Sequence, residues 1–200
     1  MIYVEDNFLD LDNFNDVNSN INNCKFTPVD VGDSFFHVQN STEKLNNYVI
    51  EKLEKIEGKK LTNIMSFFRV ATDKLDTSWR IHSDLIVNGE KPDRALVLYL
   101  SPKKRTDTHG TAFWDHVCYG KKLFNNCTNK EYDDLIKADS NNLDKWILRT
   151  VVDYEPNRLV SYPANPFEIL KRIQEEKDEI EGVDNKTNNA PKGFAESRST

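Results

Sequence analysis

The chain has 200 residues and a formal net charge of −6, with 30% charged residues and a pI near 5.3. This length suits one domain with a sizeable core, and the acidic balance does not favour nucleic acid as a partner. No apolar run reaches membrane-spanning length, and the N-terminus lacks the basic region of a signal peptide. Cys24, Cys118 and Cys127 have no metal-site spacing and suit a reducing compartment. We therefore expect a cytoplasmic protein with no membrane partner.

The N-terminal third is predicted to brace a sheet. Residues 2–9 favour a short strand, whereas residues 12–25 are rich in asparagine, which favours turns, and so predict an irregular loop. Residues 43–57 follow the hydroxyl side chain of Thr42, carry apolar residues at helical spacing and end at Gly58. These features predict a helix packed on the sheet.

The central segment carries the first chemical signal. Residues 61–71 favour a strand that leads to His82 and Asp84, which are two positions apart. Side chains in a strand alternate between its faces, so this imidazole and this carboxylate are expected on one side. Together they supply two of the three ligands of a 2-His-1-carboxylate iron site, although an H-x-D tripeptide alone is a weak signal.

Three further segments follow in an order that is typical of one known architecture. Residues 94–100 form an apolar, β-branched run that ends before Pro102, residues 110–114 read Gly-Thr-Ala-Phe-Trp, and residues 157–165 read Asn-Arg-Leu-Val-Ser-Tyr-Pro-Ala-Asn. With the H-x-D tripeptide, they resemble the Fe(II)/2-oxoglutarate-dependent oxygenases of the prolyl-hydroxylase-like branch, particularly the small phage-type members. The resemblance covers roughly residues 60–166.

This resemblance implies a mainly β fold with flanking helices, a double-stranded β-helix of the jelly-roll or cupin-like kind. It implies that His82 and Asp84 bind Fe(II) and that Tyr99 donates a hydrogen bond to the co-substrate 2-oxoglutarate; the alternative for Tyr99 is a strand tyrosine with its hydroxyl at the barrel rim. We interpret His109 and His116 as non-ligands. Residues 118–149 resemble an insertion, with a helix around residues 130–136 and with Trp146 packed inward.

The resemblance is incomplete at the C-terminal side. In the family a histidine that serves as the third iron ligand follows the Asn-Arg-Leu-Val segment, and here Glu168 stands at that position. Glu168 is either a ligand, which would favour harder ions such as Mn or Mg, or part of a helix cap with Asn165. The capping pattern predicts a charged helix over residues 167–182, followed by a polar tail over residues 183–200.

We therefore expect one oxygenase-like domain over residues 1–166 that is C-terminally incomplete. Arg198 precedes the place of the family's co-substrate-binding arginine and is a candidate for that role. Two functions stay open. The chain is either a dioxygenase that hydroxylates an unknown small-molecule or protein substrate, or a catalytically incomplete or truncated scaffold that acts as a binding or structural module.

Overall fold

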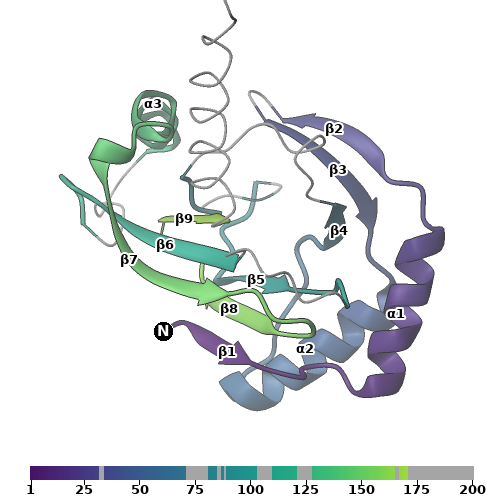
Figure 1. Ribbon diagram of the computed structural model, residues 1–200. Coiled ribbons are helices and arrows are strands. Elements are labelled where there is room, and N and C mark those ends of the chain that lie inside the picture. The colour runs from purple at the N-terminus through teal and green to yellow at the C-terminus, as the bar shows by residue number, and fades with distance from the viewer. Residues whose placement is uncertain are drawn as a thin grey trace, which may run out of the picture.

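The computed structural model describes residues 1–31, 34–70, 81–84, 87, 89–102, 110–120, 128–164 and 167–170. Within these residues the chain forms three antiparallel sheets of three strands each and three α-helices (Figure 1). The first sheet, in spatial order, consists of β1 (Tyr3–Glu5), β8 (Leu159–Pro163) and β5 (Arg94–Leu98); the second of β2 (Thr27–Val31), β3 (Ser34–Asn40) and β4 (Phe67–Val70); the third of β7 (Trp146–Asp153), β6 (Gly110–His116) and β9 (Phe167–Leu170).

The first and third sheets are linked by two paired chain segments, one carrying β5 and β6 and the other β7 and β8, which we call the ribbon. Strand β5 pairs with β8 from Arg94↔Pro163 to Leu98↔Leu159, and β6 pairs with β7 farther along the same two chain segments. Between the two pairings, Tyr99 donates from its N–H to the Arg158 carbonyl at 3.0 Å. The β5–β8 pair of the ribbon therefore belongs to the first sheet, and the β6–β7 pair belongs to the third.

Gly110 opens β6 at a point where the backbones of β6 and β7 approach closely. A Cβ atom at this position would lie 2.1 Å from the Val152 carbonyl oxygen, which no side chain tolerates. The absence of a side chain at Gly110 therefore permits the close approach of the two backbones.

The two helices that the sequence predicts have well-defined capping residues. Helix α2 (Glu43–Glu57) begins after Thr42, whose hydroxyl accepts from the Leu45 N–H at 3.3 Å, and ends at Gly58 in the left-handed conformation, with φ of 67°. Helix α3 (Asn129–Asp139) begins with a capping box between Thr128 and Glu131. Both predicted helices are confirmed.

The prediction of a loop over residues 12–25 was wrong, because residues 11–23 form helix α1 (Leu11–Asn23). The Asp10 carboxylate caps this helix by accepting from the Asn13 N–H at 2.8 Å. Phe14, Val17 and Ile21 recur at helical spacing and pack into the core, so their burial outweighs the weak helix preference of the asparagines.

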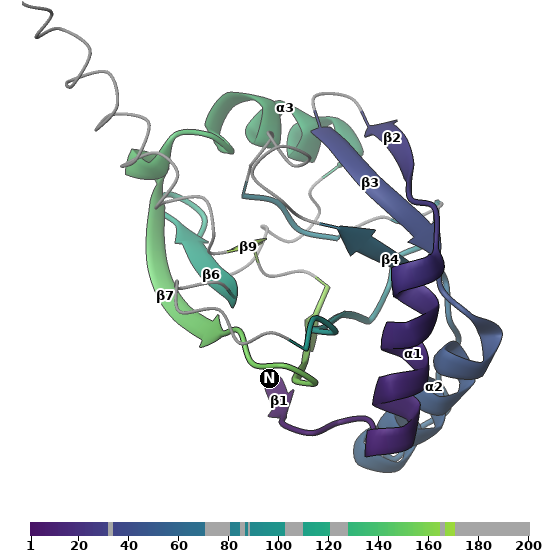
Figure 2. The same cartoon turned by 45° about the vertical axis from the view of Figure 1, so that its right-hand side comes forward.

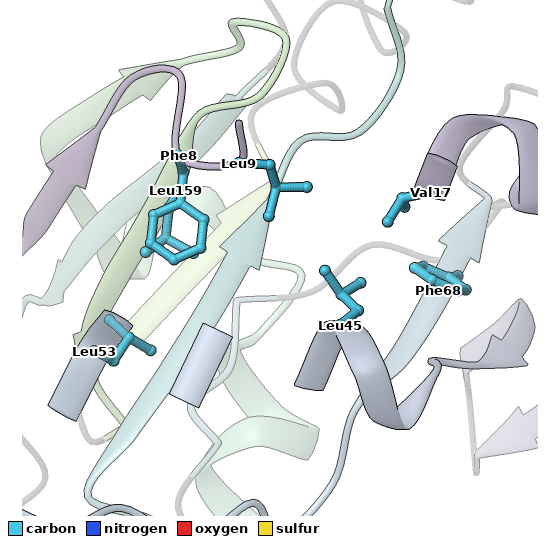
Figure 3. Close-up of a cluster of buried hydrophobic side chains, with 7 residues drawn as sticks. All are labelled: Phe8, Leu9, Val17, Leu45, Leu53, Phe68 and Leu159. Carbon is cyan, nitrogen blue, oxygen red and sulfur yellow. The ribbon is translucent and has the colours of Figure 1, made fainter. Parts of the chain in front are cut away.

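Three apolar clusters give the molecule its layers. Helices α1 and α2 lie together on one side, while α3 lies beside the β7-β6-β9 sheet (Figures 1 and 2). The first cluster joins α1, α2 and β4 to β8 (Figure 3), with buried members Phe8, Leu9, Val17, Leu45, Leu53, Phe68 and Leu159. The second lies between the two sheets of the ribbon, with buried members Tyr99, Phe113, Val152, Val160 and Tyr162. The third packs α3 against β6 and β7, with buried members Ile81, Ala112, Trp114, Ile136 and Trp146.

The C-terminal prediction needs correction. Residues 167–170 form strand β9, paired antiparallel with β6 from Trp114↔Phe167 to Thr111↔Leu170, and not the start of a charged helix. A strand register over four residues outweighs the local Asn165 and Glu168 pattern, because β6 has a second edge to pair. The rest of the predicted helix and tail, residues 171–200, lies outside the described residues.

The observed fold class is mixed helix and strand with small antiparallel sheets, and the described strands do not close into a barrel. The region expected as an insertion, residues 118–149, includes the start of β7 and contains α3 and a short 3₁₀ helix, Leu143–Lys145. Trp146 is buried, as expected. None of the described helices has the length and apolar composition that crossing a bilayer requires.

Asn157 joins the N-terminal segment to the ribbon. It has a positive φ of 62°, and its side-chain amide replaces a strand partner for Leu9: Oδ1 accepts from the Leu9 N–H at 2.9 Å and Nδ2 donates to the Leu9 carbonyl at 2.7 Å. Its own N–H donates to the Tyr99 carbonyl at 2.7 Å. Next to it, Arg158 donates to the Asp6 carboxylate and thereby lowers the pKa of Asp6.

Replacing Asn157 with alanine is expected to destabilise the protein by about 3 kcal/mol, because two buried backbone groups of Leu9 lose their partners and alanine disfavours positive φ. Glycine at this position keeps the backbone conformation and should cost about 1 kcal/mol less. Urea unfolding measures both changes. Asn20→Ala on the exposed face of α1 is the control, with an expected change within about 0.5 kcal/mol; equal losses for Asn157→Ala and Asn20→Ala would contradict the prediction.

Candidate functional site

The H-x-D tripeptide lies on a short segment, residues 81–84, that contacts α3. The Ile81 N–H donates to the Ser140 carbonyl at 3.0 Å, and the Ile81 side chain is fully buried in the α3 cluster. Ser83 is also buried. Burial therefore alternates along this segment, with residues 81 and 83 inside and residues 82 and 84 partly exposed.

The structure brings His82 and Asp84 together. Nε2 of His82 lies 3.9 Å from Oδ1 of Asp84, and the side chains are 41% and 35% exposed. Two donors about 2.1 Å from one metal ion and at right angles to each other are about 3 Å apart. The pair thus fits two neighbouring positions of one ion after a shift of about 1 Å, well within the reach of rotamer adjustment.

A third ligand is not found among the described side chains. Within that set no group of three His, Cys, Asp or Glu residues is placed to hold a metal ion. The side chain of Glu168 is outside the description, although its backbone is paired opposite Phe113 in β9. His109 and Arg198 also lie outside the described residues.

His116 has a structural environment. It is 2% exposed, its Nε2 lies 3.0 Å from Oδ2 of Asp139, and its Nδ1 accepts from the Cys118 N–H at 3.2 Å. The ring also stacks on Tyr119. Both ring nitrogens are thus engaged with the protein, which ties β6 to the end of α3.

Tyr99 follows β5 and points between the two sheets of the ribbon. Its hydroxyl lies 2.6 Å from the hydroxyl of Thr111 on β6, and its ring packs at 4.9 Å from that of Tyr154. Tyr99 is 8% exposed. The described hydrogen bonds do not join Tyr99 to His82 or Asp84.

The sequence reasoning missed two polar features near these residues. Tyr132 on α3 contacts the backbone of Ser83, and Arg149 donates from Nε to the buried Asp115 carboxylate at 2.7 Å. Arg149 is the extra residue at a β-bulge opposite β6. The sequence predicted a helix around residues 130–136 but carried no signal for the contact of Tyr132 with a residue 49 positions upstream.

Comparison of the chain with models of known protein families, with curated proteins and with solved structures found no match.

The Tyr99 and Thr111 hydroxyls are expected to act as a coupled pair. Tyr99→Phe and Thr111→Val should each destabilise the protein by about 1–2 kcal/mol, because each leaves the other hydroxyl buried without its described partner. The double variant should lose about 1 kcal/mol less than the sum. A double-mutant cycle in urea measures this coupling; strictly additive losses would show that the two hydroxyls are energetically independent.

Proposed function

We propose that this chain is an Fe(II)/2-oxoglutarate-dependent dioxygenase-like protein with a double-stranded β-helix core. In this proposal His82 and Asp84 are metal ligands and Tyr99 binds the co-substrate. The observation that carries it is the His82–Asp84 pair, whose two donor atoms are 3.9 Å apart on the partly exposed side of an anchored segment. The resemblance of the sequence to that family supports the same assignment.

The strand pairing supports the proposed core. Along the chain β5, β6, β7 and β8 follow one another, and the first pairs with the fourth while the second pairs with the third. The two pairs lie in different sheets with an apolar cluster between them. A ribbon folded over itself in this way is the unit from which double-sheet jelly rolls are built.

The direction of the side chains supports the proposed site. Ile81 packs with Ala112 and Trp114 on the α3 side of β6, whereas Thr111 and Phe113 alternate to the other side, toward the β1-β8-β5 sheet. Because His82 and Asp84 alternate with the buried Ile81 and Ser83, their side chains are expected to point away from α3.

We infer that the two proposed ligands share a side of the sheet with the Tyr99 and Thr111 hydroxyls.

The residues have distinct roles in this proposal. The neutral imidazole of His82 and the carboxylate of Asp84 would hold the metal, and the Tyr99 hydroxyl would donate a hydrogen bond to a carboxylate of 2-oxoglutarate. Iron would supply open coordination positions for the co-substrate and for oxygen. The apolar cluster around Tyr99 would exclude water from the co-substrate.

Glu168 is the proposed third position. Its backbone lies in β9 directly opposite Phe113 of β6, and in the resemblance the residue stands where the family has the histidine that is the third iron ligand. A His-Asp-Glu set adds one negative charge relative to the family's set and favours harder ions such as Mn²⁺. The earlier alternative, a helix cap, no longer competes, because residues 167–170 form a strand.

A second candidate function is an incomplete oxygenase scaffold that acts as a binding or structural module. The lack of a third ligand among the described side chains favours it. Two protein ligands hold a metal more weakly than three, because affinity follows ligand number and the groups that orient the ligands. In either case the partner is an unidentified small molecule or protein, and the proposed location is cytoplasmic.

Metal titration distinguishes the two functions. Under anaerobic conditions the wild-type protein is expected to bind about one equivalent of Fe(II), more tightly with 2-oxoglutarate present. His82→Ala and Asp84→Ala should each weaken binding by at least about 100-fold, since each removes a ligand. Asp93→Ala, which removes a surface carboxylate paired with Lys59, is the matched control and should bind as wild type. No uptake by the wild type would reject the dioxygenase in favour of the scaffold.

The identity of the third ligand has its own test. Glu168→Ala should weaken Mn²⁺ binding by about tenfold or more, and Glu168→His should raise the ratio of Fe(II) to Mn²⁺ affinity, because imidazole is a softer donor. Parallel titrations with the two ions measure both effects. Unchanged affinities in both variants would remove Glu168 from the site while leaving His82 and Asp84 in place.

A further inference from the structure

Tyr132 of α3 holds the backbone of the residue between the two proposed ligands. Its hydroxyl accepts from the Ser83 N–H at 3.0 Å and donates to the Ser83 carbonyl at 2.7 Å. A phenol has one donor and accepting lone pairs, so a single hydroxyl satisfies both backbone groups. These two bonds fix the peptide groups on both sides of Ser83, and thus the directions in which His82 and Asp84 leave the chain.

The same helix fixes the segment at a second point. The Ser140 carbonyl, directly after α3, accepts from the Ile81 N–H at 3.0 Å. Three of the segment's backbone polar groups are therefore held by α3 or its C-terminal cap, across a sequence separation of 49 residues for Tyr132. A segment without extended strand pairing in the described structure gains its shape from this helix.

Helix α3 is itself held on the β7-β6-β9 sheet by hydrogen bonds, so its position relative to residues 81–84 is fixed. Asp139 at its end contacts the buried His116 of β6 through its carboxylate, and its carbonyl accepts from Nε1 of Trp146 at 2.7 Å. The Tyr132 side chain packs against the third apolar cluster, whose buried members include Ile136 and Trp146. The position of the Tyr132 hydroxyl is thus set by β6 and β7.

We propose that Tyr132 is the positioning residue of the His82–Asp84 site, acting through the backbone of Ser83. This inference rests on the proposed function, because it assigns Tyr132 the task of holding two metal ligands at binding distance. Tyr132 itself contacts neither ligand's donor atom in the described hydrogen bonds, so it is not a catalytic residue. Groups that orient ligands in this way commonly change metal affinity by 10–100-fold.

The side chain of Ser83 offers a sharp control. Its Oγ is buried and has no hydrogen-bond partner among the described residues, whereas its backbone makes both bonds to Tyr132. Removing the hydroxyl with Ser83→Ala leaves the backbone bonds intact. A backbone role for Tyr132 therefore predicts opposite results for two substitutions at contacting residues.

The experiment measures anaerobic Fe(II) affinity of the full chain for wild type, Tyr132→Phe, Ser83→Ala and Tyr48→Phe. Phenylalanine keeps the ring of residue 132 and removes its hydroxyl; Tyr48, on α2, is the matched tyrosine in a different cluster. Tyr132→Phe is expected to bind at least about tenfold more weakly, while Ser83→Ala and Tyr48→Phe bind as wild type. Amide exchange at Ser83 should be slow in the wild type and Ser83→Ala and faster in Tyr132→Phe.

The following binding results would overturn the inference. Tyr132→Phe binding as wild type leaves the proposed function standing and removes Tyr132 from it, whereas equal losses for Tyr132→Phe and Ser83→Ala indicate general packing. If the wild type binds no Fe(II), the proposed function fails as well, and slow exchange at Ser83 then reports a structural contact only. Should Tyr132→Phe not fold, rapid Ser83 exchange in the wild type overturns the inference, and slow exchange supports the contact.

Discussion

The hydrogen bonds of Asn157 tie three separate parts of the chain together. Its side-chain amide satisfies both backbone groups of Leu9, and its own N–H donates to Tyr99, so one residue connects the N-terminal segment, the end of β5 and the start of β8. Each of these groups is buried or nearly so, and each would cost free energy without its partner. This junction sets where the helical layer meets the ribbon.

Two consequences for the candidate site follow from that junction. Phe8 and Leu9 are fixed over β8, where Leu53 of α2 joins them in one apolar cluster with Leu159 (Figure 3). With this face of β8 covered, the apolar residues of β5 and β8 that alternate to the other side pack toward the third sheet. Tyr99 directly follows β5 at this boundary, and its hydroxyl lies 2.6 Å from that of Thr111 on the opposite sheet. A polar pair is thus placed within an otherwise apolar layer.

The proposed metal site combines a rigid backbone with partly exposed side chains. The segment of residues 81–84 buries alternate residues against α3, and the same alternation leaves His82 and Asp84 open on the other side. The donor atoms of such a pair lie close enough for one ion, yet solvent reaches both. Affinity would then depend on the third donor and on how firmly α3 holds the segment, since ligand number and orientation set the strength of a metal site.

The sequence determined the features that local hydrogen bonds and periodicity encode. Thr42 and Gly58 bound α2 because capping involves residues within one turn, and the strand period placed His82 and Asp84 on one side. The same local reasoning failed for α1, where the burial of residues such as Val17 outweighs asparagine propensity.

Other features depend on contacts between residues that are far apart in the sequence. A capping pattern at Asn165 and Glu168 predicted a helix, but the free edge of β6 made residues 167–170 a strand. The contact of Tyr132 with Ser83 joins residues 49 apart, and that of Asn157 with Leu9 joins residues 148 apart. A short sequence window carries no trace of such pairings, because the free energy that stabilises them comes from groups that meet only when the chain is folded.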